Sequence, residues 1–179
     1  MACGILSLTP TMELPSSAPL TDWVRRLVDD EAGLQSALET PLLVWEGDLS
    51  EAHWVTRPPE HAPSPENPVV FVVKKVQGRA NPFGAGVTVG RAEHNDLVFP
   101  HASVSRFHAY FTPDPTQITR WNVVDAASRN GTLVDGVPLQ PNAAVLLGGA
   151  TRLNVGEMAL TFLSPEAFLR WLTKVVDAV

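Results

Sequence analysis

The stretch GVTVGRAEHNDLVFPHASVSRFHAYFT, residues 86–112, decides the fold class of this chain. In it, a β-branched run ends at Gly90-Arg91, a short apolar run follows at Leu97-Val98-Phe99, and another apolar run begins within Ser105-Arg106-Phe107-His108. Short apolar runs separated by Gly, Pro, Asn and Asp are typical of β-strands joined by turns. The central part of the chain is therefore expected to be β-structure.

The same pattern continues on both sides of this stretch. Asp135-Gly136 lies between two short apolar runs and predicts a tight hairpin. Many short strands joined by such turns favour a sandwich or barrel of antiparallel strands. The strands are expected at residues 69–76, 86–90, 96–99, 107–112, 118–124, 132–134, 144–146, 151–155 and 157–163.

Helical periodicity flanks the β-rich part of the chain. Thr21 or Asp22 is the expected N-cap of the first helical region, and Gly33 is expected to break that region into two short helices. Ser164 followed by Pro165 predicts the start of an amphipathic C-terminal helix. The apolar faces are Trp23, Leu27, Leu34 and Leu38 in the first region, and Phe168, Leu169, Leu172, Val175, Val176 and Val179 in the second.

Composition shifts along the chain predict its organisation. Residues 1–19 are rich in Pro, Ser and Thr, and residues 56–68 contain five prolines. Leu42-Leu43-Val44-Trp45 is expected to form a short strand or a buried turn, and the tryptophans are expected to be packing anchors. The predicted parts are a flexible tail (1–19), a small helical acidic region (20–55), a proline-rich linker (56–68), a β domain (69–163) and a C-terminal helix (164–179).

Composition also limits the class of protein. With 45% hydrophobic and 18% charged residues in 179, the chain is expected to be globular and soluble. No apolar run approaches the roughly 20 residues that span a bilayer, and the start resembles no secretory signal. Cys3 is the single cysteine, so no internal disulfide is possible. These features favour a cytoplasmic protein with no membrane partner.

The net charge of −6 is unevenly distributed. Residues 1–68 carry three basic and eleven acidic side chains, a net −8, whereas residues 69–163 carry eight basic and six acidic, a net +2. This balance argues against nucleic acid as the main partner. It suits a module that binds an anionic peptide, and it allows an intramolecular contact between the acidic N-terminal region and the β domain.

Three short motifs on predicted loops carry the functional signal. Together they supply an arginine, a hydroxyl group and a side-chain amide, which can bind a phosphate and the peptide backbone beside it. His108 lies within a predicted strand, so it is interpreted as a buried, hydrogen-bonded histidine. The motifs are Gly90-Arg91, Ser105-Arg106-Phe107-His108 and Ser128-Arg129-Asn130-Gly131-Thr132.

With their flanking residues, these motifs resemble the forkhead-associated (FHA) domain, a phosphothreonine-binding module, over about residues 69–163. The resemblance rests on the three motifs, on Asn95-Asp96-Leu97-Val98, and on the segment from Asp125 to Thr132. It implies an antiparallel β-sandwich of the SMAD/FHA type. It further implies non-catalytic recognition of phosphothreonine segments in Ser/Thr-kinase signalling, with kinases or their substrates as partners and no cofactor.

The resemblance also implies roles for individual residues. Arg91 and Ser105 hold the phosphate, while Asn130 and the backbone at Arg129 hold the peptide main chain. Ser128 lines the same rim, and Ser103 lies near the third residue past the phosphothreonine. Gly90, His108 and Gly131 support the site without touching the phosphate. Where a basic residue at position 103 would select an acidic peptide side chain, this chain has serine.

Two other functions stay open. One is a scaffold of the same fold that binds a partner without phosphate, for instance through the terminal helix. The other is a small hydrolase with Ser105 as nucleophile and His108 as base, although no Gly-x-Ser-x-Gly turn is present. The glycines near Gly86 do not form a dinucleotide fingerprint, and the spacing of His94, His101 and His108 does not favour a metal site.

Self-regulation is a further hypothesis. Thr9 and Thr11 lie in the predicted tail, where a kinase could reach them. A phosphorylated threonine on a tether would have an effective concentration in roughly the millimolar range at its own pocket, and would compete with external partners.

Overall fold

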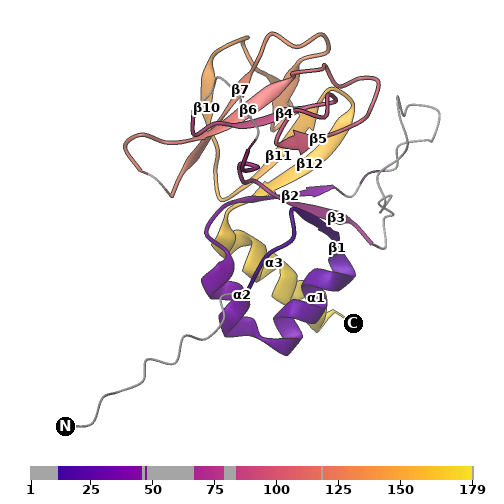
Figure 1. Ribbon diagram of the computed structural model, residues 1–179, viewed down its shortest axis with the longest axis vertical. Coiled ribbons are helices and arrows are strands. Elements are labelled where there is room, and N and C mark those ends of the chain that lie inside the picture. Colours follow the sequence, from indigo (N-terminus) through magenta and orange to yellow (C-terminus); the bar gives the residue numbers. More distant parts are fainter. Residues whose placement is uncertain (1–11, 46, 48–66, 79–83, 118, 179) are drawn as a thin grey trace.

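The computed structural model describes residues 12–45, 47, 67–78, 84–117 and 119–178. Its strands form two sheets that pack face to face, and three helices gather on the far side of the larger sheet (Figure 1). The helices are α1 (Leu20–Asp29), α2 (Glu31–Ala37) and α3 (Pro165–Asp177).

The larger sheet has seven strands in the order β1-β3-β2-β12-β11-β8-β9. These strands are β1 (Ser17–Pro19), β2 (Leu42–Trp45), β3 (Val69–Val72), β8 (Thr132–Val134), β9 (Val137–Pro138), β11 (Ala150–Val155) and β12 (Met158–Leu163). The smaller sheet has the order β10-β7-β6-β4-β5. Its strands are β4 (Val87–Gly90), β5 (Leu97–Val98), β6 (Ala109–Pro113), β7 (Trp121–Asp125) and β10 (Ala144–Leu146).

The larger sheet is buried on both faces where β2 and β3 lie. Because side chains alternate along a strand, Leu43 and Trp45 of β2 enter the core between the sheets, while Leu42 and Val44 face the helices. Every residue of β2 and β3 is buried, which explains why both are continuous apolar runs rather than alternating ones. The molecule therefore has three layers: small sheet, large sheet and helices.

Aromatic packing joins two helices within the helical layer. Trp23 of α1 and Phe168 of α3 are fully buried, and their rings meet edge to face with centroids 5.3 Å apart. Ser164 caps α3 by accepting a hydrogen bond from the Ala167 N–H at 3.2 Å. The apolar face of α3 is thus used inside the protein.

The structure confirms the β-sandwich and the C-terminal helix. Each strand predicted from the sequence is present. Strands β8 and β10 have the predicted ends, and the other predicted strands differ by one to four residues at one or both ends. Asp135-Gly136 joins β8 to β9 as a hairpin. The expectation of antiparallel pairing is wrong at one place, where β4 and β5 pair in parallel. Their connection leaves the sheet through the polar segment after Gly90 and returns beside β4.

Two helix details differ from the prediction. The first helix begins at Leu20 with Pro19 as N-cap, not at Thr21 or Asp22. The break comes at Asp30 rather than at Gly33, because the Asp30 carboxylate accepts a hydrogen bond from the Gly33 N–H at 2.9 Å and caps α2. A local side-chain cap therefore ends one helix and starts the next.

The expected tail and the expected boundary at residue 69 also differ from the structure. Part of the tail, Ser17–Pro19, forms strand β1 and pairs with β3. Strand β2 comes from the predicted helical region, yet it pairs with β3 on one side and β12 on the other. The strands of residues 17–45 thus complete the large sheet. Residues 56–66 of the predicted linker, Thr9 and Thr11 lie outside the described residues.

Trp23, Trp45 and Trp121 are buried, as expected of packing anchors, and Trp171 is half-buried. Trp54 lies outside the described residues. Within the described part of the chain, no helix has the length and apolar character needed to cross a membrane.

Candidate functional site

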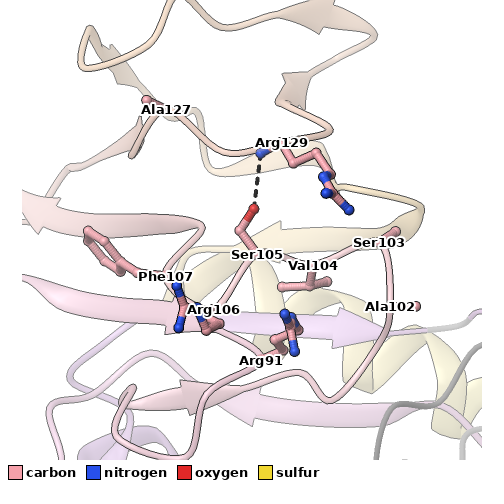
Figure 2. Close-up of a pocket in the computed structure, with 9 residues that line it drawn as sticks. All are labelled: Arg91, Ala102, Ser103, Val104, Ser105, Arg106, Phe107, Ala127 and Arg129. Carbon is pink, nitrogen blue, oxygen red and sulfur yellow. Dashed lines mark hydrogen bonds between the residues drawn. The ribbon is translucent and has the colours of Figure 1, made fainter.

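The loops after β4, before β6 and after β7 surround an open hollow of about 530 Å³ (Figure 2). Three arginines and two serines line it, together with small or apolar side chains and no carboxylate. The lining residues are Arg91, Ala102, Ser103, Val104, Ser105, Arg106, Phe107, Ala127 and Arg129. The hollow is therefore positively charged and rich in hydrogen-bond donors.

The turn after β4 fixes Arg91 against the loop that carries Ser105. The Arg91 N–H donates to the Ser105 carbonyl at 3.0 Å, and the Ala92 N–H donates to the Arg106 carbonyl at 3.2 Å. Gly90 permits this close approach, because a Cβ atom there would collide with the Arg106 carbonyl oxygen. Two loops separated in sequence are thus locked together at the base of the hollow.

Asn95 also joins the loop that carries Arg91 to the loop that carries Ser105. Its side-chain amide donates to the carbonyl oxygens of Ala92 and Arg106, both at 2.7 Å. Asn95 is fully buried, so these bonds form away from competing water. The loop that holds Arg91 is consequently positioned by side-chain bonds as well as by its strand.

Ser105 presents its hydroxyl group at the centre of the hollow. The hydroxyl oxygen accepts a hydrogen bond from the Arg129 N–H at 3.0 Å, drawn as a dashed line in Figure 2. The hydroxyl proton is left to donate outward, because the structure gives it no acceptor among the described residues. Ser105 can therefore donate to an anion while it holds the β7–β8 loop in place.

His108 joins the two loops from inside the protein. The Ser105 N–H donates to Nδ1 at 3.0 Å, so Nδ1 carries no proton, and the Nε2–H donates to the Gly131 carbonyl at 3.0 Å. Burial lowers the pKa of His108, although the Gly131 hydrogen bond and the charge of Asp125 act in the opposite direction. The ring is thus neutral, with both nitrogens used by backbone groups.

Asn130 and Ser103 are bonded to each other across the hollow's edge. The Asn130 side-chain N–H donates to the Ser103 carbonyl at 2.7 Å, and Asn130 is exposed. The Ser103 hydroxyl, by contrast, is buried: it accepts from the Glu157 N–H at 2.9 Å and donates to His101 Nδ1 at 2.7 Å. The Ser103 hydroxyl therefore has no free donor for a ligand.

The turn before Asn130 is organised by Asp125. Its carboxylate accepts from the Ser128 N–H at 2.9 Å, the Ser128 hydroxyl at 2.7 Å and the Thr132 hydroxyl at 2.6 Å. Burial alone would raise the pKa of Asp125, but the hydrogen bonds from Thr132 and Ser128 outweigh it and lower the pKa. The Ser128 hydroxyl also accepts from the Gly131 N–H at 3.0 Å.

The structure brings most of the predicted site residues together. Arg91, Ser103, Ser105 and Arg129 line one hollow, and Asn130 lies at its edge. Ser128, predicted on the rim, instead directs its hydroxyl group to Asp125 and Gly131 and is not among the lining residues. Gly90, His108 and Gly131 lie behind the hollow, in the hydrogen-bonded framework.

Sequence reasoning missed Arg106 and Phe107 as lining residues and Asn95, His101 and Asp125 as supports. Arg106 could have been predicted to line the site, because it directly follows Ser105 on the same loop. Nothing in the sequence signals the contact of Ser103 with Glu157, which is 54 residues away. In the described part of the chain, no three His, Cys, Asp or Glu side chains are placed to hold a metal ion.

Comparison with known proteins adds sequence evidence. Residues 87–156 match the family model of the FHA domain. An ABC transporter ATP-binding/permease protein of Mycobacterium tuberculosis is 39% identical over 83 residues, which are 45% of this chain and only 9% of that protein.

Solved FHA domains give weaker likenesses. The MEK1 FHA domain in complex with a HOP1 phosphothreonine peptide is 26% identical, with a TM-score of 0.41, and the match covers 53% of this chain and 87% of that one. The FHA domain of CT664 from Chlamydia trachomatis is 18% identical, with a TM-score of 0.46, over 69% of this chain and 97% of that one. On the family match, which spans all three motifs, residues 87–156 of this chain are an FHA domain.

Proposed function

We propose that the chain recognises phosphothreonine-containing segments of partner proteins through the hollow lined by Arg91, Ser105 and Arg129. The observation that carries this proposal is the convergence of three guanidinium groups and the Ser105 hydroxyl donor, with no carboxylate among the lining residues, at a site pre-assembled by hydrogen bonds to the backbone. A phosphate monoester carries about −1.5 to −2 charges at pH 7 and three strong acceptor oxygens. The membership of residues 87–156 in the FHA family supports the same ligand.

In this proposal Arg91 and the Ser105 hydroxyl hold the phosphate. Each charge-assisted hydrogen bond contributes about 1.5–3 kcal/mol, so phosphate recognition dominates the affinity. The Asn130 side chain uses its N–H on Ser103, which leaves its amide oxygen to accept from a main-chain N–H of an extended peptide. The carbonyl of Arg129 lies beside it as an acceptor for the same main chain.

Two observations weigh against the other candidate functions. His108 cannot act as a base for the Ser105 hydroxyl, because both of its ring nitrogens are bonded to backbone groups. The apolar face of α3 packs on the large sheet through Phe168 and Leu172, so it is not available to a partner. We therefore expect a non-catalytic recognition module that needs no cofactor.

The setting we expect is Ser/Thr-kinase signalling in the cytoplasm, with kinases or their substrates as partners. A single cysteine is compatible with a reducing compartment. The match to the transporter relative spans only 9% of that protein, so it gives no support for a transport activity of this chain.

The test is a titration of the full chain against labelled peptides that differ only in the phosphate on one central threonine. We expect the phosphothreonine peptides to bind at least about a hundredfold more tightly than their threonine counterparts, because two charge-assisted bonds are lost. Equal binding of both forms would overturn the proposal. Release of phosphate, or cleavage of a test ester that is abolished by Ser105→Ala, would instead favour a hydrolase.

A further inference from the structure

The hollow carries more positive charge than one phosphate group balances. Arg91, Arg106 and Arg129 all line it, and none of the nine lining residues carries a carboxylate. The structure gives these three guanidinium groups no ion pair among the described residues. A phosphate monoester supplies about −1.5 to −2 charges, so roughly one positive charge is left without an opposite partner.

Arg129 is the best placed of the two additional arginines to meet a second anion. Its backbone N–H is fixed to the Ser105 hydroxyl oxygen at 3.0 Å, which anchors the start of its side chain beside the proposed phosphate ligands. Figure 2 shows this side chain extending toward the Ser103 side of the hollow, whereas the Arg106 side chain lies on the Phe107 side. Arg129 is exposed, so its guanidinium can reach a ligand.

Among the described lining residues labelled on the Ser103 side of the hollow, Ser103, Ala102 and Val104 carry no charged group that could take the role of Arg129. The Ser103 hydroxyl is committed to the Glu157 N–H and to His101, and Ala102 and Val104 are apolar. The peptide main chain is proposed to pass Asn130, the residue next to Arg129. A peptide side chain close to the phosphothreonine would therefore meet the Arg129 guanidinium.

We propose that Arg129 is a specificity-determining residue that selects a second anionic side chain within three residues of the phosphothreonine, about 10 Å of extended peptide. The shared chemistry is a carboxylate or a second phosphate. This inference rests on the proposed phosphothreonine site, and it adds that the preferred ligand is a segment with two anionic side chains rather than one.

The test uses the full chain and labelled nine-residue peptides with a central phosphothreonine in a neutral background. One series places either Glu or its neutral counterpart Gln at each of the three positions on each side of the phosphothreonine. Another series places a second phosphothreonine at the position where the first series binds most tightly. We expect Glu at one position to bind about fivefold more tightly than Gln, as for a favourable exposed ion pair. A gain with Glu identifies a carboxylate ligand, and a gain only with the second phosphothreonine identifies a doubly phosphorylated one.

Variants then assign the gain to one residue. In Arg129→Ala the preference for the acidic peptide should fall below twofold, and Arg129→Lys should restore part of it. Arg152→Ala is the matched control, because it removes the same charge from an exposed position on β11, outside the hollow, and should keep the full preference. If Arg129→Ala lowers the melting temperature, Arg129→Gln provides the same loss of charge with more of the side chain retained.

Several results would overturn the inference. A neutral phosphothreonine peptide that binds well, with no gain from an acid at any position, would reject Arg129 as a selector while leaving the proposed function intact. If the higher affinity for the acidic peptide persists in Arg129→Ala, or is lost only in Arg106→Ala, a residue other than Arg129 selects the second anionic side chain. Failure of every phosphothreonine peptide to bind would reject the proposed function itself, and the inference with it.

Discussion

At the scale of the single residue, the Arg91 guanidinium is the group on which phosphate recognition is expected to depend. Removing it in Arg91→Ala should weaken phosphothreonine-peptide binding about 10- to 100-fold, the equivalent of one charge-assisted contact. The fold should be unaffected, because its guanidinium forms no ion pair among the described residues. Titration calorimetry and a thermal melt check both parts. Arg152→Ala controls for net charge, and binding within twofold of the wild type would show that Arg91 does not hold the phosphate.

His108 has the opposite role, since it is expected to govern stability rather than ligand chemistry. In His108→Ala the Ser105 N–H and the Gly131 carbonyl lose their partner, and a cavity is left between the loops. The expected cost is about 1–3 kcal/mol in the free energy of unfolding at pH 7.5, measured by urea denaturation. A variant as stable as the wild type, with selective loss of phosphate binding, would contradict this role.

The lowered pKa of His108 gives this stability a pH dependence. The folded state keeps the ring neutral, whereas the unfolded chain takes up a proton below about pH 6.5. The unfolded state then binds more protons, so the contribution of His108 falls as the pH falls below that value. The free energy of unfolding should therefore fall by more between pH 7.5 and pH 5 in the wild type than in His108→Ala. An equal decrease in both proteins would show that His108 is protonated in the fold.

At the scale of the element, the end of strand β4 depends on the absence of a side chain at Gly90. An added Cβ would meet the Arg106 carbonyl and come within 2.8 Å of the Asn95 amide nitrogen. We expect Gly90→Ala to lower the free energy of unfolding by about 1–3 kcal/mol, and to weaken phosphopeptide binding as Arg91 moves from Ser105. Gly149→Ala is the matched control, because its Cβ would make only an ordinary contact 3.7 Å from Ser164. Equal stability of the two variants would contradict the steric explanation.

At the scale of the whole molecule, the large sheet depends on strands from the N-terminal third of the chain. β2 lies between β3 and β12, and β1 covers the other side of β3. A chain that starts at Val69 leaves β3 with no neighbouring strand and exposes the apolar faces of β12 and α3. We expect it to show no cooperative thermal transition, whereas a chain that starts at Met12, with every described element, should unfold cooperatively. A cooperative melt with dispersed NMR signals from the shorter chain would contradict this prediction.

Much of the sandwich and of the site could be predicted from the sequence because the signals are local. The strands, the Asp135-Gly136 hairpin and the start of α3 each depend on a few neighbouring residues whose conformational preferences agree. Arg91, Ser105 and Asn130 could be found because each stands at a fixed place next to a strand-ending turn. By contrast, the expected break at Gly33 was wrong, because the Asp30 carboxylate caps the helix that contains Gly33.

The sequence by itself determined most of the strands and which side chains carry groups suited to binding an anion, because these are properties of short windows and of functional groups. Only the tertiary structure decided that β1 and β2 belong to the sheet of the FHA domain, since strand pairing joins residues that are far apart in the chain. It also decided that the Ser103 and Ser128 hydroxyls are used inside the protein, while Arg106 and Arg129 line the hollow. Whether a polar group is free depends on the partners that folding brings to it, and those partners cannot be identified from the neighbouring sequence.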